Sequence, residues 1–283
     1  MSDAFLDERP RLWGLAYRIL GSRTDADDVV QEAWLRWDRA DQNEIERPAA
    51  WLTTVTSRLA LDRLRNRRRE VAHYVGPWLP EPLITGPTDD PSDLADSITL
   101  GFLSLLEKLD PTERVVFLLA DVFREPFADI AAVVGRSEAA TRQVASRARR
   151  RLRDARRPSR GTISRAEQER LVSAFAMASL AGDLDGLKAL LAPDVTLVSD
   201  GGPNRHAARR PVVGADRVGR FLINIAPRIP VGLEVRAATI NGEPGLVLRD
   251  REKPFMTMTF HVTEGGIEEI YIVLNPDKLH DLN

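Results

Sequence analysis

The sequence contains no cysteine, which excludes disulfide bonds, thiolate metal sites and cysteine nucleophiles. It also has no apolar run near the roughly 20 residues that a membrane-spanning helix requires. The N-terminus lacks the basic segment followed by an apolar segment that marks a secretory signal. We therefore expect a cytoplasmic protein without a membrane partner.

Net charge is also nearly absent, at −2, so the total charge gives no reason to expect a polyanionic partner. The charge is unevenly distributed, however. Residues 60–69 hold five arginines and one acid, and residues 136–157 hold nine arginines and two acids. Residues 169–283 instead have 13 basic and 15 acidic residues. Positive charge is concentrated in the first half, as expected if only that half contacts nucleic acid.

The length of 283 residues allows two or three compact domains at roughly 100–200 residues each. Helical periodicity covers 1–70 and 98–157, whereas 162–283 mixes helices with strands. Residues 71–97 are rich in proline and acids and are predicted to form an extended linker. The predicted fold is multidomain, with two all-α domains followed by an α+β domain.

Several local elements are expected from cap and turn residues. Thr24 is predicted to cap a helix over 25–39, and Pro48 suits the first turn of a helix that ends near Arg68. Helices are also expected at 100–109, 111–123 and 127–134. In the last domain we expect helices at 164–181, 184–191 and 214–226, and antiparallel strands at 195–199, 233–240, 245–249, 255–262 and 267–274.

The strongest local signal lies in 127–152. Ile130, Ala131 and Val134 are predicted to form the inner side of a short helix, and Gly135 suits a turn with positive φ. Ser137 is expected to cap the next helix, which would run to Arg153. This spacing predicts a helix-turn-helix, although a helical hairpin with a solvated basic face remains an alternative.

The second of these helices presents basic and polar side chains outward. Arg142 and Gln143, near its start, are expected to reach base edges in the major groove, and the later arginines to contact phosphates. The predicted DNA-binding set is Arg136, Ser137, Arg142, Gln143, Ser146, Arg147, Arg149 and Arg150.

Together with other segments, this motif resembles one known family. Residues 27–36 (DDVVQEAWLR), 48–52 (PAAWL) and 62–65 (DRLR) look like region two of extracytoplasmic-function (ECF) sigma factors. Residues 109–114 (LDPTER) and the helix-turn-helix look like region four of the same family. The resemblance covers 5–157, with both regions in the family's order.

The resemblance implies an alternative sigma subunit that directs RNA polymerase to promoters. Asp28, Gln31 and Glu32 would bind the clamp of the largest polymerase subunit, and region four would bind the flap and read the minus-thirty-five element. The loop 41–47 would hold a base flipped from the minus-ten element. The region-two DNA-binding set is Asn43, Trp51, Arg58, Arg63, Arg65 and Arg67. Taken by themselves, however, these arginines favour a solvated helix end whose charge complements the helix dipole.

Two further segments narrow the resemblance to the ECF subgroup with a fused SnoaL-like domain. They are Trp78, Leu79, Pro80, Glu81, Pro82 and Leu83 in the linker, and Asn275, Pro276, Asp277, Lys278 and Leu279 near the C-terminus. The subgroup's Asp-Gly-Gly-Gly-Lys motif reads Asp-Gly-Gly-Pro-Asn here, beginning at Asp200. The resemblance implies that these residues mediate regulation of the sigma regions by the fused domain.

The apolar linker residues Trp78, Leu79 and Leu83 independently favour docking on the third domain, with capping of the first domain as the alternative. The SnoaL-like fold encloses a pocket, and some members are cyclases or isomerases. Asp200, His206 and His261 are the acid–base candidates, but each also has a structural explanation, such as Asp in a glycine-rich turn. A small unknown ligand in the pocket is a further hypothesis.

Three interpretations follow: a sigma factor with a built-in regulator, a bifunctional protein whose last domain is an enzyme, and a DNA-binding regulator that never contacts polymerase. The acidic helix over 25–39 argues against the third, because a simple repressor has no use for it. We favour the first, with no catalytic residue, metal or cofactor.

Overall fold

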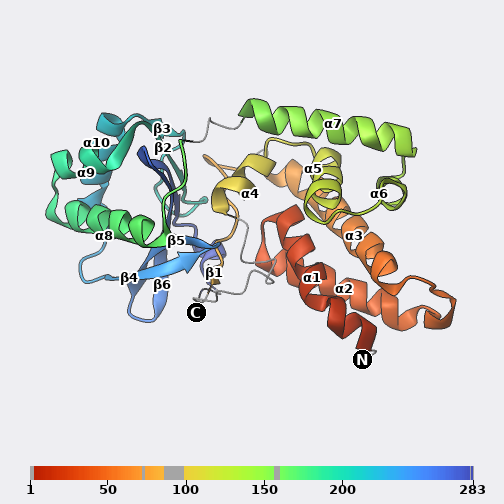
Figure 1. The fold of residues 1–283 in the computed structure, drawn as a ribbon. Helices are drawn as coiled ribbons and strands as arrows, with labels where there is room; N and C mark the ends of the chain where they lie inside the picture. The colour runs from red at the N-terminus through yellow and green to blue at the C-terminus, as the bar shows by residue number, and fades with distance from the viewer. Residues whose placement is uncertain (1–2, 72–73, 86–98, 156–159, 281, 283) are drawn as a thin grey trace. The chain divides into compact units, whose positions relative to one another are not determined.

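A computed structural model describes residues 3–71, 74–85, 99–155, 160–280 and 282, without the side chains of 3 and 68–71. It comprises two compact units. Unit 1 is built from Met1–His73 and Phe102–Arg156, and unit 2 from Tyr74–Gly101 and Arg157–Asn283. Figure 1 shows that unit 1 is helical and that unit 2 contains a sheet with helices. Residues 72–73 and 86–97 of the predicted linker lie outside the described residues.

Unit 1 begins with long helices connected by short turns. Its elements are α1 (Asp3–Leu20), α2 (Arg23–Arg39), η1 (Gln42–Glu44), α3 (Pro48–Val71), α5 (Pro111–Phe117), η2 (Leu118–Val122), α6 (Phe127–Val134) and α7 (Glu138–Ala155); α4 (Leu100–Leu106) precedes α5. Pro48 opens α3, as predicted. The cap of α2 was predicted wrongly: Ser22 Oγ accepts from the Asp25 N–H at 3.2 Å, because the helix already begins at Arg23 and Thr24 lies within its first turn.

The predicted helix-turn-helix is formed by α6 and α7. Gly135 joins them with φ +67°, a left-handed conformation in which glycine avoids the penalty of a Cβ atom. The Ser137 hydroxyl accepts from the Ala140 N–H at 3.2 Å and caps α7. Val133 is buried with Ile130 and Ala131, whereas Val134 is only half-buried, so the inner face was predicted one residue too late.

The helix predicted over 111–123 divides into the α-helical α5 and the π-helical turn η2. Asp110 and Glu113 form a capping box at the start of α5. Within unit 1, α3 packs against α1 and α2 and also against α5 and α6. The buried Arg114 of α5 donates to the Arg18 carbonyl of α1 at 2.9 and 3.2 Å, so the two arginine-rich halves of this unit form one packed body.

Unit 2 contains a mixed sheet with the strand order β1-β4-β5-β6-β7-β2-β3. Its elements are β1 (Ile84–Thr85), α8 (Arg165–Ala181), α9 (Leu184–Leu190), β2 (Leu191–Asp200), β3 (Val212–Val213), α10 (Ala215–Ile225), η3 (Ala226–Arg228), β4 (Glu234–Ile240), β5 (Glu243–Asp250), β6 (Lys253–Thr263), β7 (Gly266–Val273) and η4 (Pro276–Lys278). The α+β class and the four consecutive hairpin strands agree with prediction.

Two features of the sheet differ from prediction. β2 pairs with β7 in parallel, because these strands are distant in the chain and no hairpin turn constrains their direction. The short strands β1 and β3 were not predicted. β1 comes from the linker and pairs with β4, where Ile84 lies opposite Ile240.

The two faces of the sheet have different coverings. The helices α8, α9 and α10 lie on one face (Figure 1) and bury an apolar core in which the Phe175 and Phe260 rings are 4.9 Å apart. Strand alternation sends Tyr271 and Val273 of β7 to the other face, where they pack with Leu79 of the linker. The linker is therefore part of the core of unit 2.

Candidate functional site

The outer face of α7 carries the predicted region-four residues. Arg136, Ser137, Arg142, Gln143, Ser146, Arg147 and Arg150 are exposed. Arg149 is half-buried and donates to both carboxylate oxygens of Asp121 at 2.9 and 3.1 Å. Arg142 pairs with Glu138 and lies 4.4 Å from the centre of the Phe127 ring. The helix therefore presents a continuous basic face, with some arginines held by acids and others in solvent.

The predicted polymerase-binding residues Asp28, Gln31 and Glu32 are exposed on α2. Asp28 is also an ion-pair partner of the predicted DNA-binding Arg63, at 2.6 Å, and Arg63 contacts Asp25 at 2.7 Å. The acidic face of α2 and the basic end of α3 are thus adjacent.

The other region-two candidates lie in varied surroundings. Arg65 and Asn43 are exposed, and Trp51 is half-buried with its ring 5.5 Å from that of Trp37. Arg58 donates to the Ala132 carbonyl of α6 at 2.6 Å. Arg67 binds the Leu20 carbonyl at the end of α1 and Glu107 at 3.4 Å. In this arrangement Arg58 and Arg67 have contacts that DNA phosphates would have to replace.

Arg18 is a buried residue that no sequence pattern pointed to. Its side chain is 1% exposed, and its guanidinium nitrogens have no hydrogen-bond partner among the described residues. Burial lowers the pKa of Arg18 to about 10, because the charged form loses its hydration. The Phe123 ring, 5.6 Å away, provides the nearest compensating contact.

The predicted regulatory segments meet at one carboxylate in unit 2. Asp200, 1% exposed, accepts from the Lys278 ammonium at 2.6 Å, the Leu79 N–H at 2.8 Å and the Tyr74 hydroxyl at 2.6 Å. Asn275 donates to the Tyr74 hydroxyl at 2.9 Å. We call Tyr74, Leu79, Asp200, Asn275 and Lys278 the Asp200 cluster.

Aromatic rings complete the surroundings of Lys278. Its Nζ lies 3.9 Å from the centre of the Trp78 ring and 5.4 Å from that of Tyr74, and it also donates to the Leu79 carbonyl. Burial and the hydrogen bond to Asp200 raise the pKa of Tyr74 above its ordinary value, so this hydroxyl remains a donor. Tyr74 was absent from the sequence prediction, since it precedes the recognisable linker segment.

The rest of the docked linker crosses the sheet face toward β4. Leu79, Pro80, Pro82 and Leu83 are buried, Trp78 and Glu81 are half-buried, and Pro276 and Asp277 are exposed. The Leu83 N–H donates to the Asn241 side chain at 3.0 Å, and the Asn241 N–H donates to the Leu83 carbonyl at 2.8 Å. In the C-terminal segment, Leu279 packs in the same apolar cluster as Leu79. The docked linker is thus hydrogen-bonded to the sheet domain at two points, at Leu79 through Asp200 and at Leu83 through Asn241.

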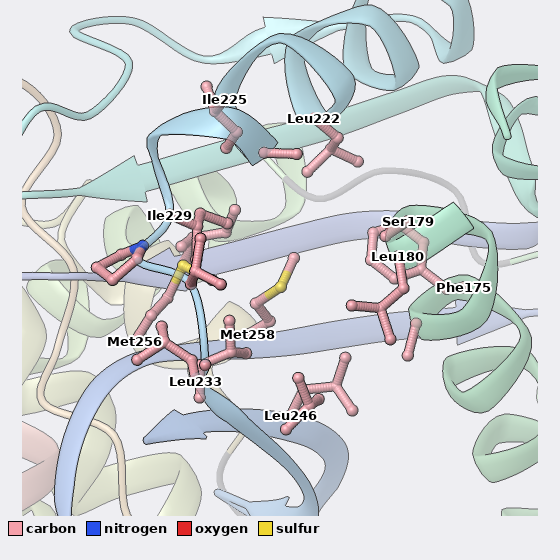
Figure 2. A pocket seen from close by; sticks show the side chains of 18 residues that line it. Phe175, Ser179, Leu180, Leu222, Ile225, Ile229, Leu233, Leu246, Met256 and Met258 are labelled. Atoms are coloured by element: carbon pink, nitrogen blue, oxygen red, sulfur yellow. The ribbon is translucent and has the colours of Figure 1, made fainter. Parts of the chain in front are cut away.

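The opposite face of the sheet holds a pocket with a volume of about 330 Å³ (Figure 2). It lies between α8, α10, the loop after η3 and strands β4 to β7. None of the acid–base candidates is among its lining residues. Asp200 belongs to the buried cluster, His206 is exposed, and His261 is an exposed residue of β6 that pairs with Glu243 at 3.3 Å. The pocket therefore lacks the side chains that the enzyme hypothesis requires.

Comparisons with known proteins agree with this arrangement. The families described as Sigma-70 region 2 and Sigma-70, region 4 match residues 4–70 and 100–152. The chain is 40% identical to the ECF RNA polymerase sigma factor SigJ of Mycobacterium tuberculosis, over 95% of this chain and 90% of SigJ. It belongs to the ECF RNA polymerase sigma factors.

Two further likenesses extend over nearly the whole sigma factor. It is 33% identical to the probable ECF sigma factor SigI of Mycobacterium tuberculosis, over 100% of this chain and 96% of SigI. Its fold matches the crystal structure of SigJ with a TM-score of 0.77 and 38% identity, over 97% of this chain and 96% of that one. The predicted organisation, helical sigma regions two and four followed by an α+β domain, is confirmed.

Membership of this family implies core RNA polymerase and promoter DNA as partners. Sigma factors are not enzymes, so the bifunctional interpretation is not supported. Among the described residues, no helix combines the length and the apolar character needed to cross a membrane.

Proposed function

We propose that this sigma factor contacts the largest-subunit clamp of RNA polymerase through Asp28, Gln31 and Glu32, and the flap through region four. The exposure of these acidic and amide side chains on one face of α2 supports the first contact. Promoter DNA would bind the basic face of α7 and the α3 end of region two. We also retain the predicted boundaries: region two at 1–70, linker at 71–97, region four at 98–157 and the SnoaL-like domain at 162–283.

The SnoaL-like domain regulates this activity by holding the linker. The minus-ten and minus-thirty-five elements lie about 85 Å apart, at about 3.4 Å per base pair. A fully extended 74–101 segment reaches on the order of 90 Å, at 3.3–3.6 Å per residue. The extended segment is therefore long enough to join two regions that bind these two elements.

Docking of the linker on the sheet prevents the 74–101 segment from extending to this length. Residues 74–85 are fastened to the sheet by the Asp200 cluster and by β1, and Leu100 packs against the same face. Because the domain is tethered to its own target, even weak contacts act at millimolar effective concentration. The Asp200 cluster is the observation that carries this proposal: release of the linker allows region two and region four to separate, and docking opposes it.

The test is transcription by sigma-free core polymerase on a library of promoter fragments. Full-length protein should give specific transcripts, and Asp200→Asn should give several-fold more at equal concentration because its linker is released. Asp216→Asn, an exposed acid of the same domain, is the matched control. If Asp200→Asn behaves like the control while its linker is demonstrably free, docking does not regulate. If neither the full chain nor one ending at Arg157 gives transcripts, the sigma assignment itself fails.

A ligand in the SnoaL-like pocket is the remaining part of the proposed function. It would shift the docked and released states only if it binds one of them more tightly. The position of the pocket, on the sheet that carries the linker on its other face, supports this role.

A further inference from the structure

The lining of the pocket restricts the chemistry of any occupant. Every described lining residue is apolar except Ser179, and none carries an ionisable side chain. Figure 2 shows Leu222 and Ile225 of α10, Phe175 of α8 and Met258 of β6 directed toward a common space. A charged ligand would lose its hydration there without gaining a partner, which disfavours its binding. An apolar ligand gains burial instead.

Ser179 is the one residue with a polar side chain among the described lining residues. Its hydroxyl is buried and has no hydrogen-bond partner among the described residues. Because the hydroxyl oxygen lies beneath the pocket surface, the described lining offers no accessible side-chain hydrogen-bonding group.

The rim of the pocket is also unusually apolar. Leu180 and Val231 both line the pocket and are 71% and 104% exposed. Met177, on the same helix as Leu180, is 68% exposed. Exposed apolar side chains around an opening are typical of ligand sites. With about 330 Å³, the pocket is roughly twice the size of a cavity that holds one benzene molecule.

Strand β7 connects the pocket with the linker. Ile272 lines the pocket, whereas its neighbours Tyr271 and Val273 face the opposite side and pack with Leu79. A ligand that packs against Ile272 on one face of the sheet therefore stabilises β7, whose other face contacts the linker.

We propose that the pocket binds an uncharged, mainly hydrocarbon molecule, and that binding strengthens linker docking through β7. Binding stands on the pocket alone, whereas its effect on transcription rests on the proposed function. The pocket acts as a receptor site, since it offers no acid–base pair.

Binding is tested on the full-length protein with N-phenyl-1-naphthylamine, an uncharged amine that fluoresces in apolar surroundings. We expect one saturable site per chain. 1-Decanol should displace the probe, and decanoate and decylammonium should be at least tenfold weaker because the pocket has no counter-charge. Absence of saturable binding, or equal competition by the charged compounds, would overturn the proposal.

The position of the site is tested by filling it. Leu248→Trp, from the sheet, and Ser179→Phe, from α8, should each abolish probe binding, whereas Val213→Trp, on the exposed strand β3, should not. Two filling variants are needed in case one fails to fold, which circular dichroism reports. Wild-type binding by both filled variants would place the site elsewhere.

The connection to the linker is tested by hydrogen exchange of 74–85, followed by mass spectrometry. Saturating 1-decanol should slow exchange there at least threefold and leave α2 unchanged. Unchanged or faster exchange would overturn the coupling through β7. Slower exchange with no effect on transcription would contradict the proposed regulation and leave the binding site standing.

Discussion

The Lys278 ammonium contacts the Asp200 carboxylate at 2.6 Å, and both side chains are buried. An ion pair in such a place contributes stability only when its remaining polar atoms have partners, because desolvation of both charges is costly. Here the linker provides those partners through the Leu79 backbone and the Tyr74 hydroxyl. The linker thus supplies the remaining hydrogen-bond partners of the Asp200–Lys278 ion pair, and the ion pair in turn holds the linker on the sheet.

A double-mutant cycle should detect this dependence. Asp200→Asn and Lys278→Met should each destabilise the docked linker by about 3–5 kcal/mol, because each leaves one buried charge without its partner. The double variant should cost clearly less than the sum. The rate of hydrogen exchange in residues 74–85 measures the effect of the two single variants and of the double variant. The exposed Asp216–Lys188 pair, substituted as Asp216→Asn and Lys188→Met, is the control and should leave exchange unchanged. Additive effects at Asp200 and Lys278 would mean that the two charges do not interact.

Removing the unpaired charge of Arg18 should stabilise unit 1. Arg18→Met keeps a similar length and removes a buried guanidinium without hydrogen-bond partners, so we expect a gain of about 1–4 kcal/mol. The pKa of about 10 means that the penalty persists at every physiological pH. Thermal unfolding measures the effect, with Arg36→Met, an exposed residue of α2, as the control. A lower melting temperature for Arg18→Met would show that the guanidinium has a partner after all.

The basic face of α7 should contribute unequally to DNA binding. Arg150 is exposed, with no ion pair among the described residues, so Arg150→Gln should weaken all DNA sequences alike and reduce the salt slope by about 0.9. Arg149→Gln should have a smaller effect because Asp121 already holds that side chain. Gln143→Ala should instead relax sequence preference. Fluorescence anisotropy of the polymerase complex across a salt series measures each slope, with Arg170→Gln in α8 as control. Equal slopes for Arg150→Gln and wild type would exclude a phosphate contact.

His261 should make unit 2 less stable as the pH rises. Its hydrogen bond to Glu243 raises the pKa of His261, and burial raises the pKa of Glu243. Both groups bind their protons more tightly in the folded chain than in the unfolded chain, so the free energy of unfolding falls as the pH rises. The loss begins above the ordinary pKa of each group, which is 4.5 for Glu243 and 6.5 for His261. The other groups acting on the pair are Glu268, Glu269 and Arg165. His261→Gln should therefore show a smaller decrease in melting temperature between pH 6 and pH 9 than wild type. An identical decrease in both proteins would contradict the assignment to this pair.

Local chemistry in the sequence was sufficient for much of the helical architecture. Gly135 and Ser137 have backbone and capping preferences that act within a few residues, so the helix-turn-helix could be predicted without any knowledge of the rest of the chain. Pro48 determined the start of α3 in the same way. Thr24 shows the limit of this reasoning: Ser22 is an equally good cap, and it is Ser22 that caps α2 in the structure.

The Asp200 cluster, in contrast, was decided by the tertiary structure. Motif resemblance indicated the segments, but it did not reveal that Tyr74, 126 residues from Asp200, would join them, or that Lys278 would supply the buried cation. The parallel pairing of β2 with β7 was equally beyond the sequence. Residue types and short spacings determine helices, caps and hairpins because those interactions are local. A buried charge finds its partner only when distant segments pack together, since the low polarity of the interior creates the requirement that the partner satisfies.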